Sequence, residues 1–123
     1  MAIHQSGEDY LEAILTLQQR NGQVRSVDVA QELGYSKPSV SIAMKKLREQ
    51  GYARMDENGL LSLTKEGEAV ARGVYERHKT LKKALMLLGV DEEAAAEEAC
   101  KLEHAISDST LEKIKAYLNR IEQ

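Results

Sequence analysis

The stretch SVDVAQELGYSKPSVSIAMKKLREQ, residues 26–50, decides how the N-terminal half of this chain folds. Its apolar residues recur three and four positions apart, which predicts one helix over residues 26–33 and a second over residues 37–50. Gly34 and Tyr35 form the short turn between them. Two helices at this spacing are typical of a helix-turn-helix, in which the second helix enters the major groove of DNA.

The cap residues and the buried positions of both helices also follow from the pattern. Ser26 and Ser36 are expected to be N-caps, and Pro38 falls in a first helical turn, where its missing N–H costs nothing. The residues expected to face inward are Val27, Ala30 and Leu33 in the first helix and Val40, Met44 and Leu47 in the second.

The outward face of the second helix is basic. Residues 36–54 carry five Lys or Arg residues against Glu49 alone, a local charge of +4 in a chain whose net charge is −3. Serine hydroxyls can bind phosphate or bases, Ile42 can contact a thymine methyl group, and the Lys and Arg side chains can bind phosphates. The predicted DNA-binding residues are Ser36, Lys37, Pro38, Ser39, Ser41, Ile42, Lys45, Lys46, Arg48 and Arg54.

A β-hairpin is predicted directly after these helices, in the sequence YARMDENGLLSLT of residues 52–64. Asn58-Gly59 is a strong two-residue hairpin signal and favours a type I′ turn between two short strands. A hairpin in this place makes the motif a winged helix-turn-helix. The alternative is a plain three-helix bundle with a solvated basic face, but such a bundle leaves the basic second helix and the hairpin unexplained.

Helical patterns continue on both sides of the winged motif. Residues 7–20 should form a first helix whose apolar positions are Leu11, Ile14, Leu15 and Leu17. After the hairpin, Thr64 is expected to cap a long helix and Asp91 to cap the next one. A final helix should begin at Ser109, in a capping box with Glu112.

Composition narrows the class of protein. No apolar run approaches the roughly 18 residues that span a bilayer, and we expect no signal peptide and no membrane partner. The lone Cys100 cannot form an internal disulfide, which suits a reducing cytoplasm. No Gly-rich phosphate loop, Ser/His/Asp set or His-Glu-x-x-His motif occurs, so we do not expect an enzyme. The fold class is predicted to be mainly α, with a winged helix-turn-helix domain over residues 1–72 and an all-helical domain over residues 73–123.

Residues 100–104, CKLEH, gather a thiol, a carboxylate and an imidazole. On a helix, positions three and four apart share a face, so Cys100, Glu103 and His104 are expected to converge. Sulfur, nitrogen and oxygen donors together suit a divalent transition metal better than calcium or magnesium. Further candidate ligands are Asp9 and Glu12, which lie three apart, and His78.

Each of these residues has a simpler explanation when it is taken alone. Asp9 and Glu12 are acids of the kind that a helix dipole favours near an N-terminus. His78 can be an ordinary solvated or core histidine. Cys100 lies beside Ala96 and Ala99, and the commonest role of such a cysteine is that of a small buried hydrophobe.

Four stretches together resemble the diphtheria-toxin-repressor family of metal-dependent transcription regulators, most closely its shorter manganese-transport-regulator branch. They are SGEDYLEAI, SVDVAQELGYSKPSVSIAMKKLREQGY, LLSLTKEGEAVARGVYERH and LGVDEEAAAEEACKLEH. The resemblance implies a repressor of metal-ion uptake genes that binds a palindromic double-stranded DNA operator as a homodimer. It also implies that residues 73–123 carry the dimer contact and that bound metal bridges the two domains.

The same resemblance implies a ligand set with one departure from the manganese branch. That branch places ligands at Asp9, Glu12, His78, Glu103 and His104, and a further Glu where this chain has Cys100. Cysteine there is a feature of the iron branch. That branch, however, has Met and Arg at the positions of the two N-terminal acids and a Glu at the position of Lys82. It usually adds an SH3-like domain, for which we expect no room here.

Iron(II) or manganese(II) is therefore the expected activator, with two neighbouring metal positions implied in each subunit. The ligands of one are Asp9, Cys100, Glu103 and His104; those of the other are Glu12, His78 and the shared Glu103. The main alternative is a winged-helix repressor that responds to an organic ligand or to oxidation of Cys100. A purely structural helical adaptor is another, but it leaves the basic helix unexplained.

Overall fold

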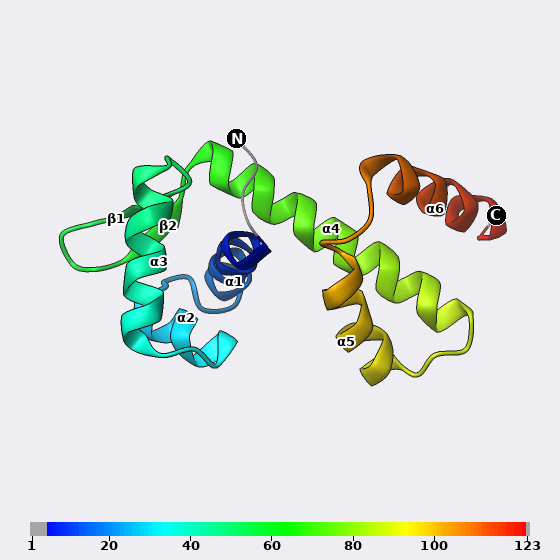
Figure 1. Cartoon of the computed structure of the whole chain (residues 1–123), viewed down its shortest axis with the longest axis horizontal. Coiled ribbons are helices and arrows are strands. Elements are labelled where there is room, and N and C mark those ends of the chain that lie inside the picture. The colour runs from blue at the N-terminus through cyan, green and yellow to red at the C-terminus, as the bar shows by residue number, and fades with distance from the viewer. Residues whose placement is uncertain (1–4, 123) are drawn as a thin grey trace. The chain divides into compact units, whose positions relative to one another are not determined.

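The computed structural model describes residues 5–122 of the chain, and the chain divides into two compact units, Met1–Arg72 and Gly73–Gln123. Figure 1 shows the helices and the small hairpin that make up these residues, so the prediction of a mainly α-helical protein is confirmed. The first unit contains α1 (Gln5–Asn21), α2 (Ser26–Leu33), α3 (Lys37–Glu49), β1 (Ala53–Met55), β2 (Leu61–Leu63) and the start of α4 (Lys65–Leu87). The second unit contains the rest of α4, then α5 (Glu92–Leu102) and α6 (Asp108–Ile121).

Helical periodicity correctly predicted most of the apolar core of the first unit. The predicted core residues of α1 and α3 are all buried: Leu11, Ile14, Leu15, Leu17, Val40, Met44 and Leu47. In α2 the prediction for Val27 is wrong, because the buried face of that helix is centred on Val29 and Ala30 and leaves Val27 exposed. Val29 lies nearly opposite Val27 on a helix of this pitch, so only one of the two can face the core.

Three of the predicted helix caps are confirmed. The hydroxyl of Ser36 accepts a hydrogen bond from the backbone N–H of Ser39 at 3.3 Å, at the start of α3. Thr64 accepts in the same way from Gly67 at 3.1 Å, at the start of α4. The carboxylate of Asp91 accepts from the N–H of Ala94 at 2.8 Å, at the start of α5. Each cap satisfies a backbone donor that has no partner within its helix.

Two predicted caps are wrong by one or two residues. Ser26 is the first residue of α2, and the residue before it, Arg25, is the N-cap; its backbone N–H donates to the carboxylate of Asp28 at 2.8 Å. The final helix begins earlier than predicted, because Ser107 rather than Ser109 has the extended backbone of an N-cap and accepts from Thr110 N at 3.1 Å.

The hairpin is confirmed but its predicted turn type is not. β1 and β2 pair antiparallel with Met55 opposite Leu61, so five residues rather than two connect the strands. A type I′ turn requires positive φ at both central residues, and here only Gly59 has it. The side chain of Asp56 forms the turn instead, accepting from the backbone N–H groups of Asn58 and Leu60 at 2.9 Å each.

A close backbone contact joins the wing to the first turn of α4. A Cβ atom on Gly67 would lie 1.9 Å from the carbonyl oxygen of Tyr52, so only glycine fits at this position. The hydroxyl of Thr64 donates to the carbonyl of Gly51 at 2.6 Å from the same junction. The start of α4 is therefore fixed against the end of α3 and the wing.

The second unit is built with a smaller apolar interior. Its buried hydrophobic residues are Val74, Leu81, Ala95, Ala99, Leu111 and Leu118. Lys82 of α4 forms an ion pair with Glu92 at 3.3 Å, which joins that helix to the first turn of α5. None of the helices in the described part of the chain combines the length and the apolar character that a membrane span requires.

Candidate metal centre and nucleic-acid interface

A buried carboxylate lies at the centre of the second unit. Glu103 follows the last residue of α5 and is only 1 % exposed. Its Oε2 lies 3.0 Å from Nδ1 of His78 on α4, and its Oε1 lies 3.3 Å from Nε2 of His104. Removing a carboxylate from water is unfavourable unless strong donors or positive charge compensate. Two imidazoles supply part of that compensation here.

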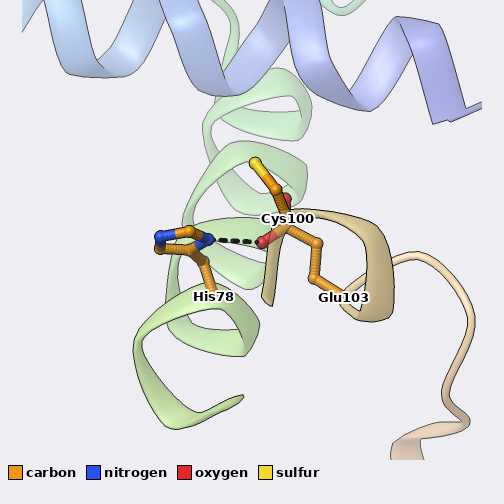
Figure 2. Close-up of side chains that lie close together, drawn as sticks. All are labelled: His78, Cys100 and Glu103. Atoms are coloured by element: carbon orange, nitrogen blue, oxygen red, sulfur yellow. Dashed lines mark hydrogen bonds and ion pairs between the residues drawn. The ribbon is translucent and has the colours of Figure 1, made fainter. Parts of the chain in front are cut away.

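The thiol of Cys100 belongs to the same cluster. Potential ligand atoms of His78, Cys100 and Glu103 all lie within 4.8 Å of one another. Figure 2 shows these side chains coming from α4 and from the end of α5. Because Cys100 is exposed, the alternative that it is a small buried hydrophobe is wrong. Its thiol is accessible to a metal ion or to a reagent from solution.

The arrangement of the predicted ligands in the second unit differs in part from the expected one. α5 ends at Leu102, so Glu103 and His104 lie in the turn that follows this helix. The thiol is grouped instead with His78, whereas His104 approaches the other oxygen of the Glu103 carboxylate. Sequence periodicity does not reveal that α4 supplies the partner of the thiol.

Asp9 and Glu12, the two remaining predicted ligands, lie on α1 in the first unit. Both are partly buried, and their spacing of three residues places them on neighbouring positions of one helical face. Asp9 and Glu12 are the fifth and eighth residues of a helix that starts at Gln5, so they lie beyond its first turn and the explanation by the helix dipole is weak for them. Their role as ligands stays a prediction.

The donor set of the second unit fits a divalent transition metal. Burial lowers the pKa of His78, and the positive charge of Lys82 lowers it further, so the imidazole is neutral near pH 7 and has a lone pair to donate. Imidazole nitrogen, cysteine sulfur and carboxylate oxygen together are typical ligands of iron(II), cobalt(II), zinc(II) and, through the carboxylate, manganese(II). His78, Cys100 and Glu103 could thus hold such an ion from within the second unit.

The predicted DNA-binding residues all lie on the exposed surface of the first unit. Every one of the ten, from Ser36 to Arg54, is exposed, and Ile42 is 71 % exposed although it is apolar. Ser36 donates its hydroxyl to that of Ser39 at 2.8 Å, so both serines are ordered at the N-terminus of α3. This end of a recognition helix is the part that meets base edges in a helix-turn-helix.

Two arginines attach the wing to the helices. Arg48 of α3 donates to the carbonyl of Met44 at 3.4 Å and approaches the sulfur of Met55 in β1 at 3.5 Å. Arg25, before α2, donates to the backbone carbonyl of Asn58 in the wing turn at 2.5 Å. Arg25 was not among the predicted residues, because the 33 positions that separate it from Asn58 leave no local pattern.

Arg77, which donates to backbone carbonyls of the turn after α5, was also not among the predicted residues, although a signal was present. Val74 and Leu81, three residues before and four after, are both buried on α4. Arg77 and His78 therefore lie on the inward face of that helix, where an arginine needs specific acceptors.

Family models match almost the whole chain. Residues 3–69 match the N-terminal DNA-binding domain of iron-dependent repressors, and residues 64–123 match the metal-binding and dimerisation domain of the same repressors. The chain is 39 % identical over 118 residues to an uncharacterized HTH-type transcriptional regulator of Methanocaldococcus jannaschii, covering 94 % of both chains. It is 35 % identical over 113 residues to the transcriptional regulator MntR of Escherichia coli O157:H7, covering 92 % of this chain and 73 % of that one.

The fold is that of solved metal-dependent repressors. A manganese-dependent transcriptional repressor in complex with manganese superposes with a TM-score of 0.85 and 33 % identity, covering 92 % of this chain and 52 % of the solved one. This chain spans about half the length of that solved chain and of the solved manganese regulator SloR. The resemblance drawn from the sequence is confirmed: the chain belongs to the iron-dependent repressor family, the diphtheria-toxin-repressor family of metal-dependent transcriptional regulators.

Proposed function

We propose that this protein is a metal-activated repressor of metal-ion uptake genes, with iron(II) or manganese(II) as its signal. The observation that carries the proposal is the buried carboxylate of Glu103, which lies between two imidazoles and beside the exposed thiol of Cys100. When bound, a divalent ion would supply positive charge to these groups and coordination bonds to their nitrogen, sulfur and oxygen atoms. Regulators are not enzymes, and we propose no catalytic activity.

The ligands proposed from the first unit are Asp9 and Glu12. They are acids on α1, the helix that packs against the DNA-reading helices α2 and α3. Coordination shared between these carboxylates and the cluster around Glu103 would link the two units. The family resemblance supports two metal positions per subunit, with Glu103 as a ligand of both.

The proposed DNA partner is a double-stranded, palindromic operator. The exposed serines and Ile42 near the start of α3 would meet base edges, and the lysines and arginines further along would meet phosphates. A protein that acts on such an operator is expected in the cytoplasm. Metal that favours the DNA-binding arrangement raises DNA affinity, and DNA raises metal affinity by the same factor.

The proposed homodimer would form through an apolar groove between α4, α5 and α6. The groove is lined by residues that include Leu85, Leu88, Leu102, Ile106, Tyr117 and Ile121. Leu88 is 81 % exposed, and several neighbours are also exposed, an arrangement typical of a surface that a partner covers. A two-fold dimer presents two recognition helices to one face of the DNA. Half-sites that are one helical turn apart require a distance of about 34–36 Å between these helices.

The proposal is tested by the metal dependence of operator binding under anaerobic conditions. An operator is first selected from a pool of random duplexes, and fluorescence anisotropy then measures affinity with manganese(II), iron(II) or zinc(II) and with excess chelator. We expect roughly 5–150-fold tighter binding with the physiological metal, the usual range of allosteric coupling. Equal affinity with and without chelator would contradict the proposal.

The exposure of Cys100 favours one second candidate, a repressor that responds to thiol oxidation. The same assay separates the two with the variant Cys100→Ser. A metal response that persists under anaerobic conditions supports metal sensing. An effect of peroxide on DNA binding that appears without metal and disappears in Cys100→Ser would favour the oxidation sensor.

A further inference from the structure

Two consecutive residues of α4 both contact Glu103, one at its side chain and the other at its backbone. His78 meets the carboxylate at 3.0 Å, and Arg77 donates from Nη1 to the carbonyl oxygen of the same residue at 3.2 Å. Contacts from α4 therefore hold both the side chain and the backbone of Glu103.

Arg77 also binds the segment that follows Glu103. Its Nη1 donates to the carbonyl of Ile106 at 2.8 Å, and its Nη2 forms an ion pair with Asp108, the first residue of α6. These bonds enclose the turn that contains His104. One guanidinium thus connects the end of α5, the turn and the start of α6.

The end of α5 requires such a donor. The last carbonyls of a helix have no N–H partner within it, and a glycine C′ residue is the usual means of satisfying them. No glycine occurs between Leu102 and Asp108. Arg77 is only 20 % exposed, and its planar fork can reach two carbonyls and a carboxylate together, which the single ammonium group of a lysine cannot do.

We propose that Arg77 is the positioning residue of the metal centre: it binds no metal, but it holds the Glu103–His104 turn in the geometry that ligation requires. This inference rests on the proposed function, because it assumes metal at Glu103. Groups that orient metal ligands commonly change affinity by about 10–100-fold when they are removed. The expected effect is therefore much larger than that of an ordinary surface ion pair.

The test uses the full chain and cobalt(II) as the probe. Cobalt(II) absorbs visible light according to its coordination geometry, and its charge-transfer band reports bonding to a thiolate. We expect Arg77→Lys to weaken cobalt(II) binding by about 10–100-fold and to alter the visible bands, with an unchanged far-ultraviolet circular dichroism spectrum. Arg72→Lys is the matched control, since Arg72 lies on the same helix and pairs with the exposed Glu68 at 2.7 Å. It should bind cobalt(II) as the unaltered protein does.

The outcomes separate this inference from the proposed function. If Glu103→Gln and Cys100→Ser bind cobalt(II) unchanged, the proposed metal centre itself is wrong. If they lose binding while Arg77→Lys keeps normal affinity and spectra, even with a lower melting temperature, Arg77 is merely structural and the inference is overturned.

If Arg77→Lys does not fold, a second variant tests the positioning role of Arg77. Asp108 has a side chain that is 90 % exposed, so Asp108→Asn should fold while it loses the ion pair that orients the guanidinium. We expect cobalt(II) affinity to fall by about threefold, in keeping with one exposed ion pair. Unchanged affinity in Asp108→Asn would then overturn the inference.

Discussion

The largest fully buried side chains of the first unit are apolar, whereas in the second unit the largest one is a carboxylate. Among the described residues, the largest side chains that are fully buried are Leu11, Ile14, Met44, Val24, Val29 and Val40 in the first unit and Glu103 in the second. The second unit at the same time exposes large hydrophobic residues such as Leu88 and Tyr117. The first unit therefore has an apolar core, and the second combines a buried carboxylate with an exposed apolar surface.

This contrast explains how the two units divide the work of a metal-dependent regulator. A DNA-reading surface must keep its shape in order to fit the groove, and an apolar core provides that shape without a ligand. A sensor must change on binding, and a buried carboxylate with nitrogen and sulfur donors makes its stability depend on what it binds. Each of the following substitutions tests a property of one of the two units.

The largest effect is expected from a cavity in the core of the first unit. Met44 is fully buried, and Met44→Ala should lower the free energy of unfolding by about 2–5 kcal/mol through lost apolar contacts and the cavity left behind. Urea denaturation followed by circular dichroism measures the change. The matched control is Met86→Ala in the second unit, where the methionine is 42 % exposed and the cost should stay within about 0.5 kcal/mol. Similar losses at both positions would refute the contrast.

A smaller effect, confined to function, is expected from the buried carboxylate. Glu103→Ala should abolish the metal dependence of operator binding, a coupling of roughly 1–3 kcal/mol, while sedimentation still finds a folded dimer. His104→Ala should act in the same direction. Glu98→Ala, which removes an exposed acid from α5, the helix that Glu103 follows, should leave the metal response intact. A full metal response in Glu103→Ala would show that the ion binds elsewhere.

The smallest effect is expected at the surface of the recognition helix. Lys46→Ala should weaken binding to all DNA sequences alike and reduce the slope of log affinity against log salt by about one, because one phosphate contact is lost. Lys79→Ala, which removes a lysine that lies over the ring of Tyr75 in the second unit, should change neither quantity. A change in base preference with Lys46→Ala would mean that this residue reads bases instead of phosphate.

Sequence patterns predicted the presence of the helices and the wing more accurately than the residues at which they begin and end. The helices α1 and α3, the wing, and the caps at Ser36, Thr64 and Asp91 were all expected from local signals. The errors arose where two local signals competed. Ser107 and Ser109 are both good N-caps, and the Asn-Gly pair is overruled by Asp56, whose carboxylate forms a wider turn.

The sequence predicted which residues belong to the candidate site but not how they are arranged. The CKLEH stretch and the family resemblance pointed to Cys100, Glu103, His104 and His78, but their arrangement differs from the predicted helical face. Arg77 was missed altogether, because its acceptors lie 26 to 31 positions further along the chain. Helical periodicity relates a residue only to neighbours within about two turns.

The sequence by itself therefore determined the helices, the basic face and the inventory of donor atoms, because propensity, spacing and charge act within a few residues of the chain. Only the tertiary structure decided that the carboxylate of Glu103 is buried, that His78 of α4 lies near the thiol of Cys100, and that a guanidinium closes the turn. Those facts depend on how α4 packs beside the end of α5. The polar groups that meet there lie 25 to 31 positions apart in the chain, a separation that no single stretch of the sequence specifies.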